Sequence, residues 1–365
     1  MRIRLQQNSS PSLPAMLAGV WAGAFLVARF ARMRRRIDFR GKVVVISGGS
    51  RGLGLEIARL LASEGARVAI LARNEPELQA AQDELKARSL LAIRQEELSP
   101  GPRVLAIPCD IGDRDQAEDA VRQVVDQYGR IDALINAAGI MQVAPIDHLT
   151  VEDFENAMAV HFWGPLYTML AVIPHMRRAG GGRIVNISSI GGKVGLPHLA
   201  PYSASKFALE GLSDTFRAEL ARDQILVSTI NPGLMRTGSF YHGNYKGQQP
   251  KEFAWFSMMA STPLTAMQSQ RAARQVLSSA RHGDAERTLT WQARVLQITE
   301  ELFPNFTAMM MKAVNSRLLP GPGGLQAGEI KTGFESRPEK IPASVTKLGD
   351  QAAERNNEMI AERGL

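Results

Sequence analysis

Residues 41–74, GKVVVISGGSRGLGLEIARLLASEGARVAILARN, constrain the fold more than any other part of the chain. The apolar run 43–46 predicts a buried strand, and the run 68–71 predicts a second one. Between them, apolar residues recur at helical spacing: Leu55, Ile57, Ala58, Leu60 and Leu61. A strand, a helix and a strand in this order form a βαβ unit, whose two strands are parallel. We therefore predict a doubly wound parallel α/β domain.

Three glycines mark the turn between the first predicted strand and the helix. They are Gly48, Gly52 and Gly54, in the spacing G-x-x-x-G-x-G. Free N–H groups and the helix dipole favour an anion at such a turn, and glycines let a pyrophosphate approach the backbone closely. The turn therefore predicts a dinucleotide site.

The end of the second predicted strand indicates which dinucleotide binds. A site for NAD has a carboxylate there that holds the ribose 2′-hydroxyl, whereas a 2′-phosphate favours arginine. This chain has Ala72, Arg73 and Asn74 at that point and Arg51 in the glycine turn. We predict a preference for NADPH; the alternative is that both arginines are merely solvated.

The stretch YSASKFALEG, residues 202–211, places a phenol and an ammonium four positions apart. On a helix, Tyr202 and Lys206 would lie on one face. A pair like this can be an ordinary surface pair. A nearby cation can also lower the pKa of a phenol from its usual value of about 10, so that it exchanges a proton near neutrality.

An ordered set of motifs resembles the short-chain dehydrogenase/reductase family over roughly residues 41–240. The motifs are SGGSRGLG (47–54), CDI (109–111), NAAG (136–139), NISS (186–189), YSASK (202–206) and NPGLMRT (231–237), and Ser189 lies 13 residues before Tyr202, as the family pattern requires. The resemblance implies a Rossmann fold and a catalytic Tyr202 that protonates a carbonyl oxygen during reduction. Ser189 would hold that oxygen, and Lys206 would bind the nicotinamide ribose while lowering the pKa of the phenol.

The resemblance also implies which residues bind the cofactor. Asp110 resembles the adenine-contacting aspartate of the family, and Ser47 stands where the family usually has threonine. At the phosphates and the adenosine the resemblance implies Ser47, Gly48, Ser50, Arg51, Gly52, Leu53, Gly54, Arg73, Asp110, Ile111, Asn136, Ala138 and Gly139. At the nicotinamide edge it implies Tyr202, Lys206, Pro232, Gly233, Met235 and Thr237.

One position departs from the family pattern in a way that concerns catalysis. In AVHFWGP, residues 159–165, His161 stands where the family usually has an asparagine that helps hold a water in the proton relay behind the lysine. Imidazole passes protons and titrates near neutrality. We therefore expect His161 to take part in proton supply; the alternative is a packed helix histidine, with water completing the relay.

The net charge lies entirely in the first 40 residues. The formal charge is +7, and residues 1–40 hold eight arginines against Asp38 alone, so the rest of the chain is formally neutral. A basic groove for nucleic acid therefore has little support. The single Cys109 cannot form an internal disulfide, which fits a reducing compartment, and the six scattered histidines lack metal-ligand spacing, so we expect no metal.

An uncharged apolar run, residues 13–28, precedes the basic sequence RFARMRRR. As a helix the run would be about 24 Å long, short of the roughly 30 Å hydrocarbon core, but uncharged residues before it can extend it. We predict a membrane anchor, with the catalytic domain in the cytoplasm because arginines follow the run. The alternatives are a helix lying in the membrane plane, a targeting peptide or a packing helix.

The second half of the chain indicates the substrate. Residues 238–264 are rich in Phe, Tyr, Trp and Met, which favours a hydrophobic, lipid-like carbonyl compound, although packing or a subunit interface would use the same residues. Residues 286–319 predict a last strand and then a helix interrupted at Pro304. Its apolar face could dock on a membrane or pack in a core or a dimer: Met309, Met310, Met311, Val314, Leu318 and Leu319.

The predicted organisation has four parts: an anchor with its basic flank (1–40), a catalytic domain (41–291), a helical extension (292–319), and a linker with a charged, disordered tail (320–365). The predicted function is NADPH-dependent reduction of a hydrophobic ketone or aldehyde. The alternatives are NAD-linked oxidation of an alcohol or hydroxysteroid, and a membrane-bound nucleotide sensor or scaffold without turnover. The resemblance implies a homodimer or homotetramer, and a tether favours the dimer.

Overall fold

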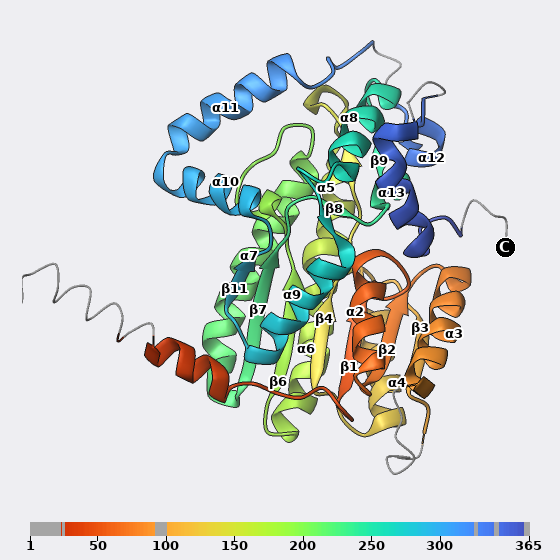
Figure 1. The fold of residues 1–365 in the computed structure, drawn as a ribbon, viewed down its shortest axis with the longest axis vertical. Coiled ribbons are helices and arrows are strands. Elements are labelled where there is room, and N and C mark those ends of the chain that lie inside the picture. Colours follow the sequence, from red (N-terminus) through yellow and green to blue (C-terminus); the bar gives the residue numbers. More distant parts are fainter. Residues whose placement is uncertain (1–22, 24–25, 92–100, 325–327, 339–342, 361–365) are drawn as a thin grey trace, which may run out of the picture.

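The protein is built around a seven-stranded parallel sheet (Figure 1). The computed structural model describes Gly23 and residues 26–91, 101–324, 328–338 and 343–360. The strand order is β11-β7-β6-β4-β1-β2-β3, so the chain starts in the centre and moves outward in both directions, which confirms the predicted doubly wound sheet. The strands are β1 (Val43–Ser47), β2 (Arg67–Ala72), β3 (Val104–Pro108), β4 (Ala133–Asn136), β6 (Gly182–Ile187), β7 (Ile225–Asn231) and β11 (Glu286–Thr288).

Both faces of the sheet are covered by helices, because its strands are apolar on both sides. Along β1, Val44 and Ile46 enter the core on one face, and Val43 and Val45 enter the core on the other. The first face packs against α2 (Gly52–Ser63), α3 (Glu75–Leu91) and α9 (Ser269–His282). The second packs against α4 (Arg114–Tyr128), α6 (Gly164–Arg178) and α7 (Ala200–Leu220).

One helical stretch of the described residues, Val151–Arg178, is long and apolar enough to cross a membrane by length and composition. It comprises α5 (Val151–Met158), the π-helical turn η2 (Ala159–Trp163) and α6. Met169 and Val172 of α6 are fully buried in the core against the sheet. The stretch is therefore weak evidence for a membrane span.

Most of the smaller elements lie beyond the carboxyl ends of the strands, and several of them line the cavity described below (Figure 1). The turn η4 (Ala221–Asp223) is the exception, because it joins α7 to the amino end of β7. The smaller strands form two short sheets, β5-β9-β12 and β8-β10. Their strands are β5 (Gln142–Val143), β8 (Met235–Arg236), β9 (Asn244–Tyr245), β10 (Met267–Gln268) and β12 (Lys331–Thr332). The short helical turns are η1 (Ile146–His148), η3 (Ile190–Gly192), η4 (Ala221–Asp223) and η5 (Ser239–His242), and the helices are α8 (Gln249–Ser261), α10 (Trp291–Leu302), α11 (Pro304–Arg317), α12 (Gly333–Ser336) and α13 (Ala343–Arg355).

The predicted boundary at residue 40 separates residues that the structure packs together. Phe39 is fully buried in the core. Arg32 forms a bidentate ion pair with Asp284, in which Nε and Nη2 donate to the two carboxylate oxygens at 2.7 and 2.9 Å. The side chain of Arg183 also donates to the carbonyl oxygen of Arg35 at 2.7 Å. The basic flank therefore belongs to the folded domain. Most of the predicted anchor lies outside the described residues; its last residues, 26–28, are helical.

The predicted disordered tail is wrong for residues 343–360, which form α13 and a following turn. Ala352 and Ala353 are buried, and Ala353 packs with Phe240 and Phe253. A β-carbon on Gly238 would collide with Ala353, so the helix approaches the domain closely at this glycine. Composition suggested disorder because the tail has few large apolar residues. The close packing of Ala353 against Gly238, however, requires small residues.

Candidate active site

A cavity of about 990 Å³ lies where the strands end, and it gathers most of the predicted site residues. Its walls come from the β1–α2 turn, the ends of β2, β4, β6 and β7, the start of α7, and the C-terminal turn after α13. The predicted residues that line it are Gly48, Ser50, Arg51, Gly52, Leu53, Gly54, Arg73, Asp110, Ile111, Ala138, Gly139, His161, Ser189, Tyr202, Lys206, Pro232, Gly233, Met235 and Thr237.

Two predicted residues, Ser47 and Asn136, do not line the cavity. Both are buried at the ends of neighbouring strands, where the Ser47 hydroxyl donates to the Asn136 side chain at 3.3 Å. The Asn136 amide in turn donates to Asn186 at 2.9 Å. These residues tie the strand ends together behind the cavity, so a direct contact with the cofactor does not follow from their positions.

The glycine turn is shaped by close backbone approaches. Gly48 has a φ of +73°, and a β-carbon there would lie 2.6 Å from the backbone of Ala138. A β-carbon on Gly54 would collide with the carbonyl oxygen of Gly48. A side chain at either position would push the turn apart, so the sequence needs glycine at both. The first residues of α2 thereby line the cavity.

Tyr202, Ser189 and Lys206 converge in the cavity from two elements. Ser189 follows β6, and Tyr202 and Lys206 lie one turn apart on α7. A hydrogen bond joins the side chains of Ser189 and Tyr202. The Lys206 Nζ lies 5.7 Å from the centre of the Tyr202 ring and donates to the carbonyl oxygen of Ile187 at 2.9 Å. The pair is therefore not an ordinary surface pair.

The pKa values of this pair differ from the expectation that Lys206 lowers the pKa of the Tyr202 phenol. Burial raises the pKa of the Tyr202 phenol above its ordinary value, and the hydrogen bond from Ser189 opposes this change. Burial also lowers the pKa of the Lys206 ammonium to about 7, which weakens it as a cation. In this structure Tyr202 is therefore a neutral proton donor.

His161 is held by two hydrogen bonds in the interior. Its Nε2 accepts from the backbone N–H of Ile140 at 3.1 Å, so the ring proton is assigned to Nδ1, which donates to the Ser205 hydroxyl at 2.8 Å. The Ser205 hydroxyl donates to the carbonyl oxygen of Tyr202 at 2.9 Å. The rings of His161 and Tyr202 meet edge to face, 5.3 Å apart.

The expectation that His161 titrates near neutrality is wrong. Burial, and secondly the charge of Lys206, lower its pKa well below the usual value. A backbone amide does not release its proton near neutrality, so a relay through Nε2 has no donor on the Ile140 side. The geometry gives His161 a positioning role at Tyr202.

At the adenosine end, the structure adds an acid that the sequence analysis missed. The guanidinium of Arg73 is 60% exposed and lies 3.5 Å from Asp110. Arg51 lies 3.4 Å from Glu77, a buried residue in the first turn of α3. A site for NAD would have a carboxylate at the end of β2, and Glu77 is not at that position in the sequence. It nevertheless lies near the end of β2 in space, because α3 begins directly after that strand.

The C-terminal turn is the other part of the site that the sequence analysis missed. Glu358 lines the cavity, and its carboxylate lies 3.6 Å from Arg51. Asn356 is fully buried, and its carbonyl oxygen accepts from the N–H of Gly52 at 3.0 Å. Local sequence gives no signal of this contact, because the partners lie at opposite ends of the chain.

The cavity fits a nicotinamide dinucleotide. The N-terminus of α2 can receive the phosphates in place of its present partner Asn356, Arg51 and Arg73 flank the adenosine end, and Lys206 can bind the nicotinamide ribose. When bound, the dinucleotide would give a hydride to a carbonyl carbon or take one from an alcohol. The fold and the site thus define a nicotinamide-linked oxidoreductase.

Comparison with known proteins supports this class. Residues 42–243 match the family model described as short chain dehydrogenase. The chain is 30% identical over 230 residues to dehydrogenase/reductase SDR family member 7C of Xenopus tropicalis, covering 63% of this chain and 71% of the relative. It is 29% identical over 279 residues to the uncharacterized oxidoreductase YxnA of Bacillus subtilis, covering 75% and 72%.

A solved structure of a short-chain dehydrogenase from Streptomyces avermitilis has the same fold. Its TM-score is 0.61 at 27% identity, and the match covers 76% of this chain and 97% of that one. The chain therefore belongs to the short-chain dehydrogenase/reductase family and is an oxidoreductase.

Proposed function

We propose that this protein reduces hydrophobic, lipid-like ketones or aldehydes with NADPH, with Tyr202 as general acid. The observation that carries the proposal is the convergence of Ser189, Tyr202 and Lys206 in a cavity with an apolar outer wall. During reduction, Tyr202 gives its proton to the carbonyl oxygen, which the Ser189 hydroxyl holds by a hydrogen bond. Lys206 binds the nicotinamide ribose and orients it toward that carbonyl.

The substrate class is proposed from the apolar residues that line the cavity together with Tyr202. Several come from α8, α10 and α11, beyond the strand ends: Trp255, Phe256, Met259, Leu296, Met311 and Val314. Large apolar and flexible methionine side chains suit a bulky hydrophobic molecule. Met311 and Val314 belong to the apolar face for which membrane docking, core packing and dimer packing were all left open, and their place in the cavity wall supports a role in substrate binding.

The preference for NADPH is supported by Arg73, which is exposed after the end of β2 and whose one ion-pair partner among the described residues is Asp110, at the long distance of 3.5 Å. A 2′-phosphate would gain a charged hydrogen-bond donor there.

The second candidate, NAD-linked oxidation of an alcohol by the same residues, is favoured by one observation. Glu77 lies beside Arg51 and could accept a hydrogen bond from a ribose hydroxyl.

We also propose a membrane location, with the catalytic domain in the cytoplasm. Support comes from the exposed apolar side chains of residues 26–33 and of α10 and α11, which are Leu26, Val27, Phe30, Met33, Trp291, Val295, Ile298, Leu302, Phe303, Phe306 and Met309. Homodimer or homotetramer assembly remains the family-based proposal. Fractionation of cells, and light scattering of the detergent-purified protein, test these two points.

The enzymatic proposal is tested with the full chain purified in detergent. NADPH and NADH consumption are measured with long-chain and polycyclic ketones, for wild type, Tyr202→Phe and the control Tyr167→Phe. Removing the general acid should lower the rate by about 10²–10⁴-fold, with no loss of rate in the control. Equal rates in wild type and Tyr202→Phe would rule out the proposed acid, and higher rates with NADH would favour the second candidate.

A further inference from the structure

Helix α13 ends in a turn that points its last residues into the cavity. Asn357 has a left-handed φ of +60°, a conformation that asparagine tolerates better than most residues. The N–H of Glu358 donates to the carbonyl oxygen of Ala353 at 3.0 Å, the bond that closes a Schellman motif. This turn reverses the chain and brings residues 356–358, here called the C-terminal plug, against the glycine turn.

The plug contacts the backbone atoms where a dinucleotide's phosphates are expected. The carbonyl oxygen of Asn356 accepts from the N–H of Gly52, the first residue of α2, at 3.0 Å. The side chain of Asn357 donates to the carbonyl oxygen of Ser50 at 3.3 Å. Oε1 of Glu358 is so close to Gly52 that a β-carbon on this glycine would lie 2.9 Å from it. The plug therefore occupies the open end of α2.

Glu358 brings a carboxylate to this anion-binding end. It is 2% exposed, and its Oε2 has no hydrogen-bond partner among the described residues. The charged and titratable groups that face it are Arg51 of the glycine turn, at 3.6 Å, Glu77 of α3, and His242 of η5. Burial raises the pKa of Glu358 to about 7, Glu77 adds to this rise, and Arg51 opposes it. Among the described residues, Oε2 therefore has a nearby cation but no hydrogen bond, so the interactions of this carboxylate are incomplete.

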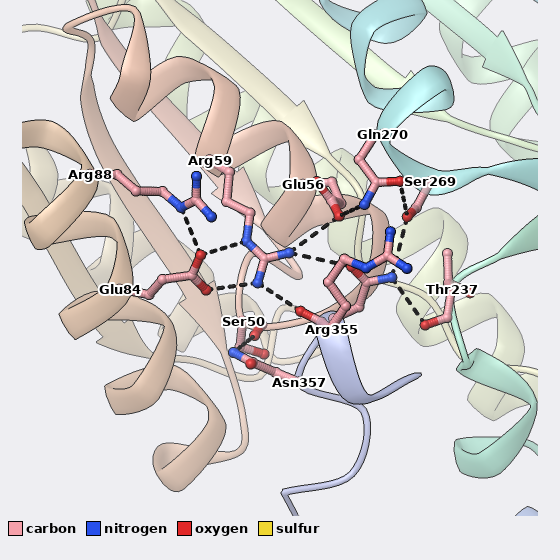
Figure 2. A network of polar contacts seen from close by, with 11 residues as sticks. Ser50, Glu56, Arg59, Glu84, Arg88, Thr237, Ser269, Gln270, Arg355 and Asn357 are labelled. Carbon is pink, nitrogen blue, oxygen red and sulfur yellow. Dashed lines mark hydrogen bonds and ion pairs between the residues drawn. The ribbon is translucent and has the colours of Figure 1, made fainter. Parts of the chain in front are cut away.

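Specific hydrogen bonds hold the plug in place. Arg59 of α2 donates to the carbonyl oxygen of Arg355 at 2.8 Å and to the Asn356 side chain at 3.4 Å, while Glu84 orients its guanidinium (Figure 2). The Asn356 amide also donates to the carbonyl oxygen of Thr237 at 3.2 Å. Two walls of the dinucleotide site, the glycine turn and the segment after β7, are therefore both bonded to the plug.

We propose that residues 356–358 are an intramolecular ligand of the dinucleotide site, with the Glu358 carboxylate in place of a phosphate, and that cofactor binding displaces them. The Gly52 N–H cannot donate fully to the Asn356 carbonyl and to a phosphate at once. A phosphate beside the Glu358 carboxylate would also bring two anions together in a buried place. The inference rests on the dinucleotide binding that the family implies, and it does not depend on which substrate is reduced.

The proposal predicts that weakening the plug tightens cofactor binding. The apparent dissociation constant equals the intrinsic one divided by the fraction of molecules with the plug released. Glu358→Gln removes the charge, and Glu358→Arg adds repulsion from Arg51. We expect dissociation constants for NADPH about threefold and about tenfold lower than in wild type, respectively. The matched controls are the same substitutions at Glu354, which is exposed on α13 one turn earlier.

Binding is measured by calorimetry on the full-length protein, without substrate. Unchanged or weaker binding in both Glu358 variants would overturn the proposal, because a plug that clamps a bound cofactor would lose affinity when weakened. Absence of NADPH and NADH binding in every variant would also overturn it. Tighter binding without turnover of any ketone would instead reject the proposed reductase and leave the plug supported.

Hydrogen exchange gives a second readout that does not depend on substitutions. Adding NADPH to wild type should increase exchange at the amides of residues 352–358 and decrease it in the glycine turn. Increased protection of both segments would mean that the C-terminal residues close over the cofactor, and the proposal would be rejected.

Discussion

The Nε2 atom of His161 accepts a hydrogen bond from the backbone N–H of Ile140, while its Nδ1 bonds the hydroxyl of Ser205. Both ring nitrogens are therefore used to connect the loop after β4 with helix α7. This arrangement holds the loop beside the catalytic helix, while burial lowers the pKa of the imidazole.

His161→Ala should destabilise the protein without changing its pH profile. The Ile140 N–H and the Ser205 hydroxyl lose a partner, which should lower the free energy of unfolding by about 1–3 kcal/mol. Denaturant unfolding measures this loss, and His175→Ala, on the partly exposed side of α6, is the control. The pH dependence of kcat/KM should keep its inflections, since a buried neutral histidine contributes none. Loss of an inflection near pH 6–7 in His161→Ala would restore the proton-supply role.

Lys206→Met should stabilise the fold most at neutral and lower pH. Burial lowers the folded-state pKa of Lys206 from 10.5 to about 7, while Glu210 opposes this change. Below pH 7 the ammonium is buried and charged, so the full free-energy cost of burying this charge lowers the stability of the fold. This cost decreases as the pH rises from 7 to 10.5. The gain in unfolding free energy should be at most about 5 kcal/mol, reduced by the lost hydrogen bond to Ile187. Thermal unfolding between pH 6 and 10 measures it, and a gain that grows with pH contradicts the prediction.

Arg73→Ala should weaken NADPH binding selectively. If the exposed guanidinium bonds the 2′-phosphate, its loss removes a charge-assisted hydrogen bond, which raises the KM for NADPH by about tenfold or more. The KM for NADH should stay the same. Arg122→Ala, on the exposed side of α4, is the control for surface charge. An equal change for both cofactors would argue against a 2′-phosphate contact at Arg73.

Two N-terminal deletions should differ sharply in their effect on the melting temperature. Removing residues 1–28 leaves Arg32 paired with Asp284 and Phe39 in the core, so the melting temperature should be unchanged. Removing residues 1–40 also takes away Phe39, and loss of a buried phenylalanine costs about 3–5 kcal/mol. Thermal unfolding of both proteins checks this. Equal melting temperatures would show that the flank packs without adding stability.

The sheet and the glycine turn could be predicted because their signals are local. Buried parallel strands read as continuous apolar runs, and the close approaches at Gly48 and Gly54 require glycine. The convergence of Ser189, Tyr202 and Lys206 was implied by family motifs in order. Local periodicity alone would have left the Tyr202–Lys206 pair unexplained.

The remaining features depend on contacts between distant segments. The pKa values of Tyr202 and His161 follow from burial, which spacing along the chain does not reveal. Phe39 looked like part of a basic flank because its core partners come later in the sequence. The C-terminal plug was missed for the same reason: Asn357 and Ser50 are separated by 307 residues.

That separation also sets an order in time. A ribosome adding about 5–20 residues per second makes the glycine turn roughly 15–60 s before it makes the plug. The turn takes its shape against Ala138, and the site also needs the strand ends up to Thr237, so a folded site without the plug can exist only in the last part of this interval. A chain that folds its site within that time would meet the cellular pool of dinucleotides before it has made the plug, and the plug would then act on molecules that are completed empty or that release their cofactor later.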